Sequence, residues 1–149
     1  MNVWIKELLN KLDSHVKEDK RIEIMEACGQ KCPFTHLTDA RLLDIKKKSL
    51  NETDFLERLS QQWHVKIEDG NIYVVFDTCY CPLVNKDISG VSATLCYCTQ
   101  GNIKRKFKIG LGRDVDVCME KTREKLLFIR TETPRTLPWS NFEPLIYYD

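Results

Sequence analysis

The chain has 149 residues, with 23 Lys and Arg against 22 Asp and Glu, and a formal net charge of +1 at pH 7. Hydrophobic residues make up 42% and charged residues 30%, the balance of a folded globular protein, which excludes a disordered tail or a polybasic nucleic-acid arm. No apolar run is long enough to cross a bilayer and residues 1–12 lack a secretory signal, so we expect a cytoplasmic protein with no nucleic-acid or membrane partner.

Apolar residues recur every three or four positions along the first part of the chain, which predicts four helices. The first helix has one apolar face, formed by Ile5, Leu8, Leu9, Leu12 and Val16. The second covers residues 21–28 and is expected to end at Gly29. Thr38 is the predicted N-cap of the third helix and Asn51 that of the fourth.

After residue 64 the hydrophobic period changes to two, which predicts β-strands. Segments 64–68 and 71–77 flank the tight-turn sequence Asp69-Gly70 and are expected to form a hairpin. A third strand is predicted over residues 92–96, where apolar and polar residues again alternate.

The remaining pattern predicts one more helix and a second hairpin. A helix is expected within residues 99–111, closed by Gly110 and Gly112. Apolar and polar residues alternate over 113–121, which predicts a strand, and residues 126–131 can return beside it as a second strand across the polar turn 122–125. The predicted fold class is therefore α+β, with N-terminal helices packed on an antiparallel sheet that has one inserted helix.

The length predicts a single domain, covering residues 1–132, to which an aromatic tail of residues 133–149 belongs. The tail holds Trp139, Phe142, Tyr147 and Tyr148, which would expose a large apolar patch if they were left in water. We therefore expect the tail to cover a sheet edge of its own chain or of a second copy, which makes a homodimer a candidate.

Seven cysteines are unusual in a chain that is expected to remain reduced. Six of them form close pairs: Cys28 with Cys32, Cys79 with Cys81, and Cys96 with Cys98. Paired thiols in a reducing compartment indicate metal ligands, reactive groups or small core residues. On an extended chain a Cys-x-Cys pair points both thiols to one side, and two facing pairs would supply the four thiolates of a structural zinc site. All six cysteines are candidate ligands of a zinc-type ion.

The expected sheet raises an objection to this metal site. If the third strand pairs with residues 71–77, Cys79 and Cys81 lie at the opposite edge from Cys96 and Cys98. The metal interpretation then requires one of three conditions: the connection between the two strands folds back, the strands are not neighbours, or Cys28 and Cys32 supply half of the ligands.

Cys98 is also a candidate nucleophile, because it precedes the expected helix start and a helix N-terminus lowers a thiol pKa. Lys104 and Arg105 follow on the same helix, and residues 99–130 carry nine bases and four acids. These two bases are candidate ligands of a small acidic molecule, although a basic stretch is more commonly a solvated helix face.

The cysteine pairs and the segment after them also carry a resemblance. The quoted stretches are Cys28-Gly29-x-x-Cys32, Cys79-Tyr80-Cys81-Pro82-Leu83-Val84, Cys96-Tyr97-Cys98-Thr99-Gln100-Gly101 and Leu111-Gly112-Arg113-Asp114-Val115-Asp116-Val117. They resemble an uncharacterised prokaryotic cysteine-pair family described as similar to L-2-amino-thiazoline-4-carboxylic acid hydrolase. The inserted helix and last hairpin are similar to the 4-vinyl reductase domain, of the fold shared with nitric-oxide-signalling and Golgi-transport proteins. The resemblance implies a ligand pocket between sheet and helices with cysteines at its wall.

Three functions remain open at this point. The first is a small-ligand or metal-binding domain without turnover, in which the cysteine pairs hold a zinc-type ion. The second is a thiol-dependent hydrolase of a small sulfur heterocycle that uses Cys98, as the resemblance implies. The third is a structural module that binds a partner through its tail. We prefer the non-enzymatic binding domain.

Overall fold

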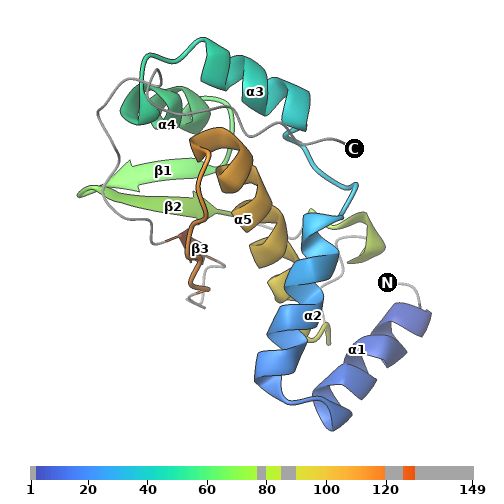
Figure 1. Ribbon diagram of the computed structural model, residues 1–149. Helices are drawn as coiled ribbons and strands as arrows, with labels where there is room; N and C mark the ends of the chain where they lie inside the picture. Colours follow the sequence, from blue (N-terminus) through green and yellow to red (C-terminus); the bar gives the residue numbers. More distant parts are fainter. Residues whose placement is uncertain (1–2, 77–79, 85–89, 120–125, 130–149) are drawn as a thin grey trace. The chain divides into compact units, whose positions relative to one another are not determined.

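The computed structural model describes residues 3–76, 80–84, 90–119 and 126–129 (Figure 1). The helices and strands, in chain order, are α1 (Val3–His15), α2 (Glu18–Gln30), α3 (Asp39–Lys47), α4 (Glu52–Ser60), β1 (Val65–Glu68), β2 (Asn71–Val75), the short 3-10 helices η1 (Pro82–Val84) and η2 (Ala93–Leu95), α5 (Cys96–Leu111) and β3 (Leu126–Ile129). The predicted α+β class with a helix inserted into a small antiparallel sheet is confirmed. None of the described helices has the length and apolarity to cross a membrane.

The chain divides into two compact units. Unit 1 is Met1–His36 with Asp77–Ile103, and unit 2 is Leu37–Phe76 with Lys104–Asp149. Helix α5 therefore contributes its first half to unit 1 and its second half to unit 2. The single domain over residues 1–132 stays a prediction, and the tail 133–149 lies outside the described residues.

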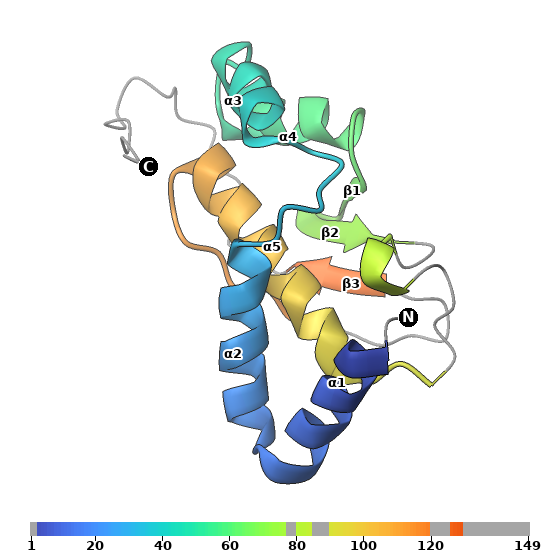
Figure 2. The same cartoon turned by 90° about the vertical axis from the view of Figure 1, so that its right-hand side faces the viewer.

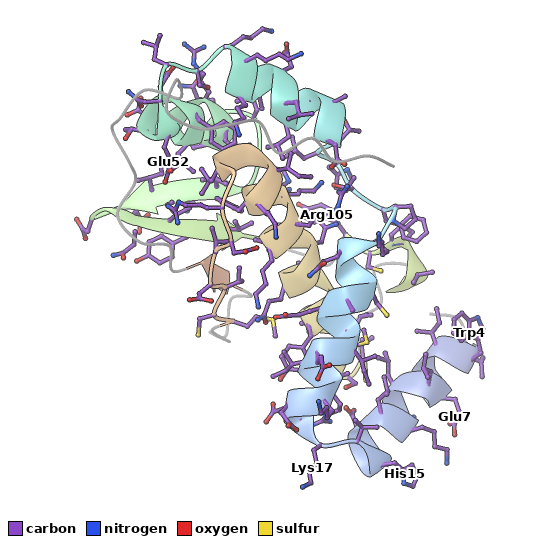
Figure 3. All side chains as sticks on the ribbon, in the orientation of Figure 1. Trp4, Glu7, His15, Lys17, Glu52 and Arg105 are labelled. Atoms are coloured by element: carbon purple, nitrogen blue, oxygen red, sulfur yellow. The ribbon has the colours of Figure 1, made fainter. Side chains whose placement is uncertain are left out.

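The core of unit 1 lies between α1 and α2, which follow one another as a helical hairpin (Figure 2). Ile5, Leu9 and Met25 are buried, and the partly buried side chains packed against them are Leu12, Val91, Leu95, Tyr97 and Cys98. Leu8, which we expected on the apolar face, is 48% exposed, and the side chain of Trp4 also points away from α1 (Figure 3). The buried face is therefore narrower than the sequence pattern indicates.

Polar contacts tie the start of α5 to both N-terminal helices. The carboxylate of Asp13 accepts hydrogen bonds from Arg21 on α2 and from Thr94 on η2, both at 2.6 Å. Hydrogen bonds from Ser92 and Thr94, with that of Arg21, hold the pKa of Asp13 below its ordinary value. Tyr97 donates to Glu18 at 2.7 Å. These contacts fix the segment before Cys98 against α1 and α2.

The third strand predicted over residues 92–96 is wrong. Ser92 caps a 3-10 turn by accepting a hydrogen bond from the backbone N–H of Thr94, and this turn leads directly into α5. The helix thus begins at Cys96, before the expected start at residue 99. The side chain of a serine cap bonds a backbone N–H group of the helical turn, and this local cause is not visible in the alternation of apolar and polar residues.

Several elements of unit 2 begin or turn at residues that the sequence identifies. Thr38 accepts a hydrogen bond from the backbone N–H of Arg41 and Asn51 accepts one from Asp54, so both predicted N-caps are confirmed. The β1–β2 hairpin is confirmed as well. Its turn needs two residues of positive φ, which Asp69 (51°) and Gly70 (75°) provide.

The sheet of unit 2 has the strand order β1-β2-β3, with antiparallel pairs. Figure 1 shows α3 and α4 on the side of β1, and α4 packs against that strand. The core holds Phe55, Leu59, Ile72 and Val74, together with Phe107 of α5. Unit 2 therefore has its own buried interior.

The second hairpin is only partly as predicted. β3 exists over residues 126–129 and pairs with β2; of the predicted partner segment, residues 113–119 are described, and they form no strand. Within residues 113–119, Val115 and Val117 are buried while Asp114 and Asp116 are exposed, so the alternation predicts burial correctly although the predicted strand does not form there. Gly112, at φ 72°, ends α5 as expected. Gly110 lies within the helix, in contact with Phe55.

Candidate functional site

The candidate site in unit 1 begins with a very close approach of α2 and α5. A Cβ atom on Gly29 would lie 1.8 Å from the carbonyl oxygen of Cys98, and one on Gly101 would lie 2.0 Å from that of Glu26. Asn102 donates to the Gly29 carbonyl at 3.4 Å. The two backbones are in direct contact, which only glycine permits at these positions. Gly29, expected to stop α2, is instead a buried contact residue one position before its end.

A third segment, the chain before η1, lies against the chain that follows α2. The ring of His36, which follows α2, packs edge-on against the ring of Tyr80, with centroids 5.4 Å apart. Tyr80 is the neighbour of Cys81. The chain after α2 and the chain before η1 therefore lie together; the first carries Cys32, four residues before His36, and the second carries Cys81, which follows Tyr80.

Four thiols gather at this place, and we call them the thiol cluster: Cys28, Cys32, Cys81 and Cys98. Cys98 forms a side-chain hydrogen bond with Cys32, and the charges of Cys32, Cys81 and Cys28 all act on it. Cys32 in turn donates to the carbonyl oxygen of Phe34 at 3.8 Å. All four are thiols without a disulfide. Figure 3 shows sulfur atoms in yellow beside α2 and the start of α5.

The thiol cluster holds the proton on Cys98. Burial against the core of unit 1 raises the pKa of the Cys98 thiol to about 12, and repulsion from the charged forms of Cys32, Cys81 and Cys28 and the hydrogen bond to Cys32 add to the rise. We expected the helix N-terminus to lower this pKa, and the opposite holds. The helix begins three residues earlier than predicted, and the side chain of Cys98 is partly buried beside three other thiols. The candidate role of Cys98 as a nucleophile stays a prediction.

The donor set is that of a soft metal ion, since four cysteines from three separate segments converge on one place. Among the described residues, no three Cys, His, Asp or Glu side chains lie close enough together to enclose an ion as they stand. Closure on an ion would require rotation of cysteine side chains, which is open to the half-exposed Cys32 in the turn after α2.

Two further cysteines that the structure describes, Cys96 and Cys118, are exposed. Because Cys96 lies on a helix and not on a strand, its i, i+2 spacing to Cys98 places the two thiols on different faces, contrary to our expectation. Cys79, a predicted ligand, lies outside the described residues. Cys118, which the sequence leaves unpaired, is exposed in unit 2.

The two candidate anion ligands lie on the second half of α5, in unit 2. Arg105 forms a bidentate pair with Asp39, at 2.8 and 2.5 Å, and Lys104 is half-buried. Of their neighbours, Lys106 is buried and donates to the Leu37 carbonyl, and Lys108 pairs with an aspartate at 2.9 Å. Much of the positive charge of α5 is thus compensated within unit 2. The assignment of Lys104 and Arg105 to a ligand stays a prediction.

Sequence reasoning missed the residues that bring the cysteines together. Gly29 directly follows Cys28 and Gly101 lies three residues after Cys98, which is a weak signal for a glycine-mediated helix contact. The ring contact between His36 and Tyr80 has no signal in the sequence, because it joins residues 44 positions apart. The alternative in which the first cysteine pair supplies half of the ligands is the one that resembles this geometry.

Comparison with known proteins adds a family and no activity. Searches of curated proteins and of solved structures found no match to this chain. The expected similarities to the hydrolase and to the 4-vinyl reductase domain thus gain no support. Residues 1–124 match the model of a family of unknown function, DUF6144, and this range contains all seven cysteines. The chain belongs to the DUF6144 family.

Proposed function

We propose that the chain is a metal-binding domain in which the thiol cluster holds one zinc-type ion. The observation that carries the proposal is that Cys98 lies among Cys28, Cys32 and Cys81 in a partly buried position. Four thiolates are the ligand set of a closed structural zinc site, and such a site contributes to folding without catalysis.

The electrostatics of the cluster support this proposal. Four ionised thiolates beside one another repel, and this repulsion contributes to the high pKa of Cys98. A divalent cation at the centre would convert that repulsion into attraction and displace the thiol protons. The cluster therefore favours a cation over an organic anion, and it disfavours the alternative in which Cys98 attacks a substrate.

The scaffold around the cluster supports a structural role for the ion. Two of the ligands come from the end of α2 and the turn after it, one from the segment before η1 and one from the first turn of α5. An ion bound by all four would join three segments that are distant in sequence, which stabilises a small unit with a modest core.

The test is elemental analysis of full-length protein prepared without oxygen, combined with thiol counting. We expect about one zinc-type ion per chain in the wild type and in Cys118→Ser, the matched control outside the cluster. Cys98→Ser and Cys81→Ser should lose the ion and unfold at a lower temperature. Wild-type protein that takes up no added zinc, with all seven thiols titratable in denaturant, would contradict the proposal.

A further inference from the structure

One carboxylate on α1 holds the start of α5. Thr94, in the 3-10 helix η2 that runs directly into α5, is 3% exposed and donates a hydrogen bond to Asp13 at 2.6 Å. Arg21 on α2 donates to the same oxygen atom, Oδ1, also at 2.6 Å. Hydrogen bonds to an ionised carboxylate are roughly twice as strong as those between neutral groups. We call these three residues the Asp13 clamp, which joins α1, α2 and η2 within unit 1.

The Asp13 clamp lies about one helical turn before Cys98. Thr94 precedes Cys98 by four residues, and the helical backbone between them is continuous from η2 into α5. The side chain of Cys98 is partly buried and packs against the core that α1 and α2 form. Backbone hydrogen bonds link residues four positions apart in a helix, so a displacement of one turn is passed to the next. Movement of Thr94 therefore moves Cys98.

Cys98 has a second fixed point in its own backbone. Its carbonyl oxygen lies so near Gly29 on α2 that a Cβ atom there would be 1.8 Å away. A single point of contact would let the first turn of α5 tilt, whereas two points one turn apart determine where its side chains point. A zinc–sulfur bond is about 2.3 Å long and tolerates a deviation of only about 0.2 Å. The place of the Cys98 sulfur therefore matters for an ion.

We propose that Asp13 is a positioning residue of the metal site, which acts through Thr94 to hold the thiol of Cys98 in the thiol cluster. The consequence for the ion rests on the proposed metal function, whereas the hold on Cys98 exists in the metal-free protein. Loss of the Asp13 clamp loosens the first turn of α5, so Cys98 becomes more accessible and the ion is bound more weakly. Replacement of residues that orient metal ligands typically weakens metal binding about 10–100-fold.

The first experiment measures the hold on Cys98 in full-length, metal-free protein. Iodoacetamide is added, and mass spectrometry of peptides gives the labelling rate of each cysteine, with the exposed Cys96 as internal reference. Thr94→Val preserves the shape of the side chain and removes the donor, so Cys98 should be labelled about tenfold faster. This is the factor by which loss of one hydrogen bond to a charged group favours a local opening. Thr94→Ser retains the hydroxyl group and should be labelled at the wild-type rate.

Asp39→Asn is the matched control, because it weakens a carboxylate–arginine pair in unit 2. This variant should leave the labelling rate of Cys98 unchanged. An unchanged rate in Thr94→Val, or a rate that rises equally in Asp39→Asn, would overturn the positioning role. If Thr94→Val does not fold, Asp13→Asn decides, since it offers an acceptor oxygen to both donors but lacks the charge. Cys98 should then be labelled faster than in the wild type, and an equal rate would overturn the role.

The second experiment measures the ion in the same variants. Cobalt(II) is titrated in place of zinc, because its absorption reports thiolate ligands and tetrahedral geometry. Thr94→Val should bind cobalt about 10–100-fold more weakly than the wild type, and Thr94→Ser should bind it equally well. Equal affinity in Thr94→Val and the wild type would overturn the proposal. If Cys98 is labelled faster as expected but the wild type binds neither cobalt nor zinc, the hold on Cys98 stands and the metal function fails.

Discussion

The contact between α2 and α5 predicts a large effect of a single methyl group at Gly29. A Cβ atom there would lie 1.8 Å from the Cys98 carbonyl oxygen, whereas ordinary contacts begin at 3.4 Å. The two backbones would have to separate by roughly 1.6 Å, the difference of these distances, because a backbone carbonyl cannot rotate away as a side chain does. Gly29→Ala therefore displaces α5 together with Cys98.

Two opposing terms set the stability of this variant. Alanine in a helix interior is favoured over glycine by about 1 kcal/mol, whereas overpacking of a close contact costs about 1–3 kcal/mol and occasionally more. Because the obstructing atom belongs to another helix, we expect the clash to dominate, with a net loss of about 1–2 kcal/mol in the free energy of unfolding. Guanidinium unfolding of the metal-free protein, followed by far-UV circular dichroism, measures it.

Gly110→Ala is the matched control. A Cβ there would lie 2.4 Å from the ring of Phe55, a fully buried residue of unit 2, so this variant should also lose stability. Only Gly29→Ala should in addition weaken zinc binding, since Gly110 lies in unit 2 and the thiol cluster in unit 1. If Gly29→Ala were more stable than the wild type by the helix-propensity gain of about 1 kcal/mol, the close approach of α2 and α5 would be refuted.

Three further predictions concern unit 2 and the tail. The hydrogen bonds of Arg105 hold the pKa of Asp39 below its ordinary value of 3.8, so the pair stabilises the fold above about pH 4 and loses this effect as the pH falls. In urea unfolding from pH 6 to pH 2, the free energy of unfolding of Asp39→Asn should therefore be lower than that of the wild type only at the upper end of this pH range. Glu52 is buried and pairs with Arg113 at 2.7 Å, so Glu52→Leu, which leaves the arginine without this partner, should lower the free energy of unfolding by about 3–5 kcal/mol. Adding Arg113→Met should recover part of that loss, and thermal unfolding of both variants tests this. Deletion of residues 133–149 should cause aggregation or change the oligomer, as light scattering would show, and a truncated protein that keeps its mass and solubility would contradict our expectation for the tail.

The parts of the fold that were predictable are those with short-range causes. Thr38 and Asn51 each cap a helix through a hydrogen bond to a residue three positions away, and Asp69-Gly70 turns the chain within the hairpin itself. Such signals are complete within a window of a few residues. Their outcomes depend little on the rest of the molecule, and all three were confirmed.

The pairing of β3 shows where this reasoning ends. The sequence identifies residues 126–129 as a strand, but the strand that pairs with it is β2, about fifty residues earlier in the chain. A nearer segment, residues 113–119, has the alternation of a strand, yet it holds only a single bridge residue, Cys118, and no strand. Alternation reports burial of one side of an extended chain, whereas pairing depends on which edge lies free in the folded unit.

The change from strand to helix at Cys96 alters what the third cysteine pair does, and it gives a decisive comparison. On a strand, Cys96 and Cys98 would face the same side and serve equally as ligands. On α5 they lie about 200° apart around the axis, and Cys96 is exposed while Cys98 packs on the core of unit 1. We therefore expect Cys96→Ser to retain zinc and wild-type stability, while Cys98→Ser loses both; elemental analysis and thermal unfolding of the two variants measure this difference. If both variants lost zinc and stability equally, Cys96 would be a ligand like Cys98, and the ligand set inferred from the helical arrangement would be refuted.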